Sequence, residues 1–177
     1  MKKGLLIVAI ALAVVIGYVA AGPYLAVEAI KTGIVENNHE KLSENIEIVT
    51  LRNNLLDQLN EAITKFADAG AEQDPFAAFA ATLASRYVGS VANSIVAPSG
   101  LAAYMEGRVP PGNSAEPAGK APSKDSLLKN GSYSYDSASE FSISVPNEMG
   151  GKATFVLQRK GLTWKLVNLV LPVNVES

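Results

Sequence analysis

The stretch that decides the fold is "KATFVLQRKGLTWKLVNLVLP", residues 152–172. It contains two runs rich in Val, Leu, Phe and Trp, which favour β-strands. Lys160 and Gly161 lie between the runs, and a short connection that contains glycine is typical of a β-hairpin. The second run is apolar on both faces, which predicts a central strand of a sheet.

Two more strands are expected before this hairpin. In "EFSISVPN", residues 140–147, apolar residues alternate with serines, which is the period of a half-buried strand. "SYSYDS", residues 132–137, alternates in the same way, and residues 147–151 predict a turn. The C-terminal third of the chain therefore predicts an antiparallel β-meander.

The middle of the chain predicts helices. Residues 50–70 repeat apolar side chains every three or four positions, with Thr50 as the expected cap. Residues 74–96 begin with Asp-Pro, a typical helix start, and shorter helices are expected over 36–46 and 98–107. Helices followed by strands predict an α+β fold, with the helices packed on one face of the sheet.

Residues 108–124, "RVPPGNSAEPAGKAPSK", separate the helices from the strands. They hold four of the nine prolines and predict a flexible loop. The chain is thus expected to divide into an N-terminal segment, residues 1–32, and one exported α+β domain, residues 33–177.

The N-terminal segment opens with "MKKGLLIVAIALAVVIGYVAAGPYLA", and residues 4–27 are uncharged. About 20 apolar residues suffice to cross the hydrocarbon core of a bilayer. The two lysines at its start predict that this end stays in the cytoplasm and the rest lies outside. The sequence therefore predicts a single-pass protein of the bacterial inner membrane with its C-terminal domain in the periplasm. Tyr18 and Tyr24 lie where an aromatic belt is expected, and a helix continues from Tyr24 to a stop at Gly33.

A cleaved signal peptide is the alternative. Val19-Ala20-Ala21 could serve as the cleavage site, and cleavage near Ala21 would release the domain into the periplasm. Retention is favoured because the apolar run is longer than a typical signal core and continues without a polar break into a helical stripe.

The composition excludes several classes of function. The chain of 177 residues has no cysteine, which rules out disulfides, thiol catalysis and cysteine-based zinc sites. The formal net charge is −2, without the clustered basic face that nucleic-acid binding needs. His39 is the only histidine and stands in a polar stretch, which predicts a surface residue. No catalytic residue, metal ligand or cofactor site is predicted.

A few residues are candidates for lining an apolar ligand pocket. Arg86 and Tyr87 interrupt an apolar helix and could lie at a pocket mouth, while Tyr133, Tyr135 and Trp164 could line its interior. Packing is the favoured explanation of the same residues, because aromatic rings fill cores and an arginine can extend its stem over apolar surface.

Five stretches resemble a known bacterial family, domain of unknown function 2939. They are "PYLAVEAIKTG", "LRNNLLDQL", "IVAPSGLAAYMEG", "YSYDSASEFSISV" and "FVLQRKGLTWKLVNLVLP". The resemblance runs nearly end to end, departs at Ala97, where relatives carry a threonine cap, and implies no activity. The last strand is also similar to that of nuclear transport factor 2-like domains, which implies a curved sheet wrapped on helices.

Three functions follow as hypotheses. The first is a non-catalytic, membrane-anchored envelope domain that binds a small apolar ligand or a partner protein. The second is a small-molecule enzyme of the nuclear transport factor 2-like type, using a pocket carboxylate such as Glu106 or Asp136 with a tyrosine. The third is a structural module that dimerises through its open sheet face.

Overall fold

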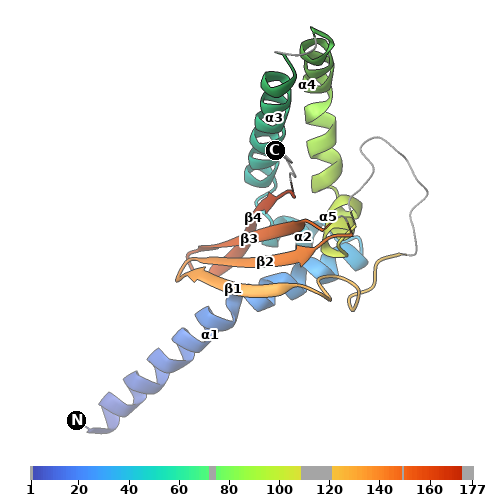
Figure 1. Ribbon diagram of the computed structural model, residues 1–177. Helices are drawn as coiled ribbons and strands as arrows, with labels where there is room; N and C mark the ends of the chain where they lie inside the picture. Colours follow the sequence, from blue (N-terminus) through green and yellow to red (C-terminus); the bar gives the residue numbers. More distant parts are fainter. Residues whose placement is uncertain (1, 72–74, 109–120, 149, 173–177) are drawn as a thin grey trace.

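The computed structural model describes residues 2–71, 75–108, 121–148 and 150–172 (Figure 1). Side chains 2–16, 19, 66, 69–71 and 75–82 lie outside the description. The described chain forms five helices and then four strands, which confirms the α+β class. The helices are α1 (Lys2–Val35), α2 (His39–Asn45), α3 (Ile48–Ala71), α4 (Pro75–Val96) and α5 (Pro98–Met105). The strands are β1 (Ser132–Ser137), β2 (Glu140–Pro146), β3 (Lys152–Lys160) and β4 (Thr163–Val170).

The strands form the predicted antiparallel meander, in the order β1-β2-β3-β4. Phe141 of β2 faces Leu157 of β3, and such pairs collect the apolar side chains on one face of the sheet. Gly161 has a φ of +67° in the turn between β3 and β4, a conformation that glycine adopts without steric cost. The helices cover the apolar face, as the sequence predicts (Figure 1).

The prediction that the last strand is central is wrong, because β4 is an edge strand. Its free edge is covered by the segment between α2 and α3. Ile46 forms a parallel bridge with Leu166, and the Glu47 N–H donates to the Leu166 carbonyl at 2.9 Å. Helix α3 then packs along the same strand.

The β4 run looks apolar on both faces in the sequence because a register shift against β3 leaves Val167 as an extra residue. Trp164, Leu166 and Leu169 share the buried face. Lys165 and Asn168 lie on the other face.

Side-chain amides of α3 complete this edge. Asn54 Nδ2 donates to the Val167 carbonyl at 2.9 Å. Gln58 Nε2 donates to the Leu169 carbonyl at 3.0 Å, and Gln58 Oε1 accepts from the Leu171 N–H at 3.1 Å. The Gln58 amide thus pairs with β4 as the peptide group of another strand would, which satisfies backbone groups that an edge strand leaves unpaired.

Helix α1 crosses the apolar face of the sheet. Its C-terminal turns enter the core through Ala26, Val27, Ile30 and Ile34. Pro23 lies inside the helix without ending it, and the helix runs two residues beyond the stop predicted at Gly33. Thr50, the predicted cap of α3, lies inside that helix instead, because α3 begins at Ile48.

Helices α3 and α4 lie side by side and extend away from the sheet, on the opposite side from the N-terminal half of α1 (Figure 1). Helix α5 starts at Pro98, and Ala97 before it provides no side-chain cap, as its identity predicts. Most of the loop predicted over 108–124 lies outside the described residues.

No helix in the described part of the chain combines the length and the apolar character that crossing a membrane requires. The span predicted over residues 4–27 falls largely on side chains outside that part.

Candidate functional site

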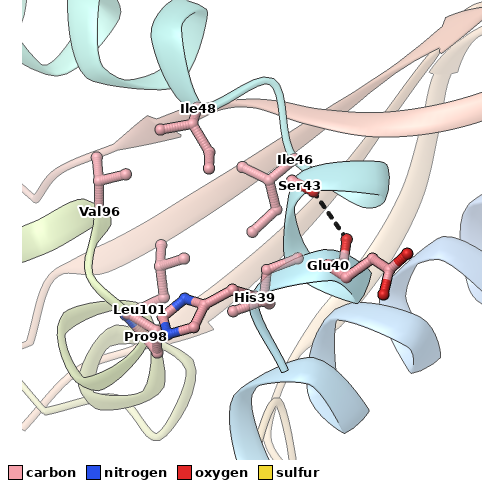
Figure 2. Close-up of a pocket in the computed structure, with 9 residues that line it drawn as sticks. His39, Glu40, Ser43, Ile46, Ile48, Val96, Pro98 and Leu101 are labelled. Carbon is pink, nitrogen blue, oxygen red and sulfur yellow. Dashed lines mark hydrogen bonds between the residues drawn. The ribbon is translucent and has the colours of Figure 1, made fainter. Parts of the chain in front are cut away.

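A pocket of about 490 Å³ opens where α2, the start of α3, the end of α4 and the start of α5 meet (Figure 2). Its volume falls in the range of small-molecule sites, about 300–1,000 Å³. It is lined by His39, Glu40, Leu42, Ser43, Ile46, Ile48, Val96, Pro98 and Leu101.

Local sequence signals place these residues. The Asn38 side chain accepts from the Lys41 N–H at 3.0 Å and caps α2. One turn later the chain leaves α2 at Ile46 to pair with β4, which turns the start of α3 away from α2. On the other wall, Pro98 interrupts the path from α4 into α5, because proline cannot continue a helix from the preceding turn. Two helix breaks therefore create the space.

The lining is mainly apolar, and its polar groups lie at the rim. His39 is exposed, and the Ser43 hydroxyl is occupied by a hydrogen bond to the Glu40 carbonyl at 2.9 Å. Figure 2 shows the Glu40 carboxylate extending away from the apolar side chains. The arrangement offers dispersion contacts to an apolar group and few directed hydrogen bonds.

None of the five predicted pocket residues lines this space. Arg86 and Tyr87 are exposed on α4. Tyr133, Tyr135 and Trp164 do come together, but elsewhere, in an aromatic cluster between α1 and the sheet. The structure therefore brings the three predicted residues of the sheet together and places the two predicted residues of α4 apart from them.

The aromatic cluster is closely packed around Phe141. The Tyr135 ring stands at 70° to the Phe141 ring with centroids 4.8 Å apart, and at 79° to the Trp164 ring at 6.1 Å. Tyr24 of α1 stacks on Tyr133 at 6.0 Å. Such edge and stacked geometries are the favourable ones for aromatic pairs. The cluster thus fastens α1 to the sheet.

The surroundings of Tyr133 and Tyr135 favour the neutral forms of these two phenols. Burial raises the pKa of Tyr133, and the neighbouring Tyr24 and Glu28 raise it further. Burial and Tyr24 also raise the pKa of Tyr135. Neither hydroxyl is activated as a base or nucleophile, since that role requires a lowered pKa.

The carboxylates named for the enzyme hypothesis lie outside the pocket lining. Asp136 is exposed on β1. Glu106 follows α5 and joins Arg108 to Ser126. Burial alone would raise the pKa of Glu106, but hydrogen bonds from Ser126 and Arg108 and the charge of Arg108 together lower it. Glu106 is therefore held ionised, which suits a structural link better than a general acid.

Two further features of the structure limit the chemistry of the described residues. Over the described residues, no group of three or more His, Asp or Glu side chains is placed to hold a metal ion. The same part of the chain buries no polar or charged side chain.

The pocket residues could not be predicted from the sequence, because helix periodicity marks Leu42, Ile46 and Leu101 as core. The only features of the sequence that point to the pocket are the two helix breaks, at Ile46 and Pro98.

A family profile described as "Protein of unknown function (DUF2939)" matches residues 12–104, just over half of the chain. The chain belongs to this family. The matched range covers most of the helical part of this DUF2939 protein and includes every pocket-lining residue, while the strands lie beyond it. No curated protein and no solved structure matches the chain. The similarity to nuclear transport factor 2-like domains stays a prediction.

Proposed function

We propose that this protein is a non-catalytic, membrane-anchored domain that binds a small apolar molecule in the pocket between α2, α3, α4 and α5. The observation that carries the proposal is the pocket itself, a cavity of about 490 Å³ with a mainly apolar lining. A ligand with a flexible hydrocarbon chain fits its chemistry best, because the walls offer apolar surface and few directed polar groups.

The position of Ile48 supports access from solvent. Ile48 lines the pocket and is half-exposed, so apolar surface reaches the rim. Buried Leu42 and Leu101 form the inner wall. Covering the rim with a ligand would remove this surface from water, which contributes about 25 cal/mol per Å² of apolar area.

Membrane attachment through residues 4–27 is the second part of the proposal. Its support is the uncharged length of the segment and the two lysines before it. These features favour the bacterial inner membrane, a single pass and a periplasmic domain. The division between an N-terminal segment, residues 1–32, and a domain, residues 33–177, stays a prediction. Ala26 and Ile30 belong to the N-terminal segment and lie in the core of the domain.

Retention of the segment is favoured over cleavage near Ala21. Residues 19–21 lie inside the continuous helix α1, and the Ala20 carbonyl accepts a hydrogen bond from the Tyr135 hydroxyl. A full-length mass for the protein recovered from the membrane fraction of cells is expected, and a mass beginning near Gly22 would contradict retention.

A photoreactive fatty acid tests the ligand proposal. The full-length protein in lipid vesicles would be irradiated with a diazirine-bearing medium-chain fatty acid, and the labelled peptides would be mapped by mass spectrometry. We expect labels on two segments, residues 39–48 and 96–101. Fatty acid dissolved in the bilayer should also label α1. Labels on α1 alone would refute the pocket while leaving the anchor intact.

A matched pair of variants sharpens this test. Ile48→Glu places a charge at the rim and should reduce pocket labelling, relative to α1 labelling, by about tenfold, which corresponds to about 1.4 kcal/mol. Val49→Glu is the control, because Val49 is the next residue of the same helical turn, is 72% exposed and does not line the pocket. Equal labelling of the two variants would contradict the proposed site.

A further inference from the structure

Four of the six tyrosines gather where α1 leaves the folded body. Tyr18 and Tyr24 come from α1, and Tyr133 and Tyr135 come from β1, the edge strand opposite β4. Their exposed fractions are 54%, 49%, 41% and 45% respectively, so each ring is shared between protein and surroundings. We refer to these four residues as the tyrosine collar. Of the other two tyrosines, Tyr104 is buried and Tyr87 lies on α4.

Direct contacts fix three of the four collar tyrosines, and Tyr18 lies on α1 two residues before Ala20. The Tyr135 hydroxyl donates to the Ala20 carbonyl, which lies on α1 between the two collar tyrosines of that helix. The Tyr24 ring stacks on Tyr133, with the two ring planes 22° apart. The β1 edge is therefore fixed beside one particular turn of α1, and the collar keeps its place relative to the helix axis.

The collar separates an uncharged part of α1 from a charged part of the surface. Residues 4–27 carry no charge, and Glu28 is the first charged group beyond them. Glu28 lies 3.2 Å from Lys124 and 3.7 Å from Lys31. Apolar helix, tyrosines and ion pairs thus follow one another along α1, which is the order of hydrocarbon, headgroups and water at a bilayer surface.

The dimensions of α1 show what this order requires. Residues 4–17, on the lipid side of Tyr18, correspond to about 21 Å of helix, which is shorter than a hydrocarbon core of about 30 Å. The anchor therefore requires local thinning of the bilayer. Tyr18 and Tyr24 are six residues apart, which corresponds to about 9 Å along a helix. The headgroup layer on each side of a bilayer is roughly 5–8 Å thick, the difference between its core and total thickness halved. An apolar side chain adds to the same end, because Leu162 is 64% exposed in the turn that precedes Trp164, whose ring packs against Gly22.

We propose that the tyrosine collar lies in the headgroup layer of the membrane that α1 enters, so that the β1 edge of the sheet rests on the lipid surface. This inference depends on the membrane attachment proposed above. Phenol rings suit the layer because their apolar bodies face hydrocarbon while their hydroxyls stay hydrated.

The contact gives the domain a fixed orientation. With β1 on the surface, the lipid covers the strand edge that no other strand pairs with in the described sheet. Helices α3 and α4 extend from the opposite side and therefore point into the aqueous compartment (Figure 1).

Spin-label accessibility tests the inference on the full-length protein. The chain has no cysteine, so a single introduced cysteine carries a nitroxide without background labelling. Labels would be placed with Tyr133→Cys and Tyr135→Cys in vesicles of phosphatidylethanolamine and phosphatidylglycerol. Val49→Cys and Tyr87→Cys are the controls, being 72% and 58% exposed on helices away from the collar. Ile10→Cys reports on the anchor alone.

The oxygen-to-nickel collision ratio distinguishes the outcomes. We expect it to be several-fold higher at positions 133 and 135 than at 49 and 87, because oxygen concentrates in lipid and the nickel complex in water. A water-like ratio at both collar positions with a lipid-like ratio at 10 overturns the collar and leaves the anchor standing. A water-like ratio at 10 overturns the proposed anchor itself. Low collision rates with both reagents at 133 and 135 indicate a protein cover and also overturn the lipid contact.

Circular dichroism melting of each labelled variant shows whether it is folded. Tyr135→Cys removes the hydrogen bond to Ala20, so Tyr133→Cys, which keeps that bond, is the decisive variant if the two disagree.

Discussion

Helices α1 and α3 meet the same sheet through different chemistry. Helix α1 crosses the apolar face, where Gly22 lies under Trp164 and Tyr24 packs on Phe141 with centroids 5.1 Å apart. Helix α3 joins the edge of β4, where Asn54 and Gln58 bond to backbone groups. The first contact depends on the shapes of large rings, and the second on the placement of donors and acceptors.

The difference shows how each part of the sheet is protected from solvent. The face needs burial, which a helix with a small residue at the crossing point provides by close approach. The edge needs partners for its N–H and C=O groups, which side-chain amides supply without adding a strand. We therefore expect substitutions at the α1 contact to act through packing and those at the α3 contact to act through unpaired backbone groups.

Truncating the tryptophan should have the largest effect. Trp164→Ala removes a buried ring from between α1 and the sheet and should lower the free energy of unfolding by about 3–5 kcal/mol. Thermal melting of the full-length protein in detergent, followed by circular dichroism, measures the loss. Tyr87→Ala, an exposed aromatic on α4, should stay within about 0.5 kcal/mol of the parent. Equal losses in both variants would show that Trp164 is not central to the α1 contact.

Filling the crossing point should come next. A Cβ on Gly22 would lie 2.5 Å from Trp164 Cδ1, closer than any real packing contact. Gly22→Val should therefore lower the free energy of unfolding by about 1–3 kcal/mol through overpacking. Gly17→Val on the same helix meets no atom within 4 Å and is the control. Urea denaturation of the two variants compares them, and an unchanged midpoint for Gly22→Val would mean that α1 does not approach the sheet this closely.

Removing the edge amide should have a smaller effect. Gln58→Leu leaves the Leu169 carbonyl and the Leu171 N–H without the partner that Gln58 provides, at a cost of about 1–2 kcal/mol. Hydrogen exchange should show faster exchange of the Leu171 amide, while the amides of β2 keep their protection. Asn60→Leu changes an exposed amide two residues along α3 and should alter neither quantity. Loss of protection throughout the sheet would argue against a contact confined to the edge.

The smallest expected effect is a loss of stability at alkaline pH, which should weaken the α1 contact and leave the α3 contact unchanged. The pKa values of Tyr133 and Tyr135 are raised in the folded state by burial, so the neutral phenols favour folding. This stabilisation is complete below about pH 10, the ordinary tyrosine pKa, and is lost as the pH rises through the folded values. The effect is modest because both rings are partly exposed. A double Phe variant at 133 and 135 should lose less stability between pH 9 and 11 than the parent. The amides of α3 do not titrate, so Gln58→Leu should follow the parent, and identical profiles for all three proteins would contradict this assignment.

Much of the architecture could be predicted from local sequence. The alternation in residues 140–147 requires one buried face, and the glycine at 161 permits the turn that makes the next two strands antiparallel. The repeat of Leu51 and Leu55 likewise identified the buried side of α3. These features are periodic along the chain, so no distant contact is needed to recognise them.

The pocket and the position of β4 could not be predicted in this way. The register shift at Val167 makes a one-sided edge strand look apolar on both faces in the sequence. The donors that complete the edge come from residues about 110 positions away, such as Gln58. The pocket arises from two helix breaks, at Ile46 and Pro98, whose relative placement is fixed only when α2 and α5 pack on the same core.

The sequence by itself determined the α+β class, the meander, the helices and the family, because periodicity, turn residues and family motifs are local properties. Only the tertiary structure decided which helix protects the edge of β4, where the apolar pocket opens and that three of the five candidate residues belong to an aromatic contact with α1. The physical reason is that each of these depends on the meeting of surfaces from distant parts of the chain. A side chain's identity limits what it can contact, but packing selects the partner.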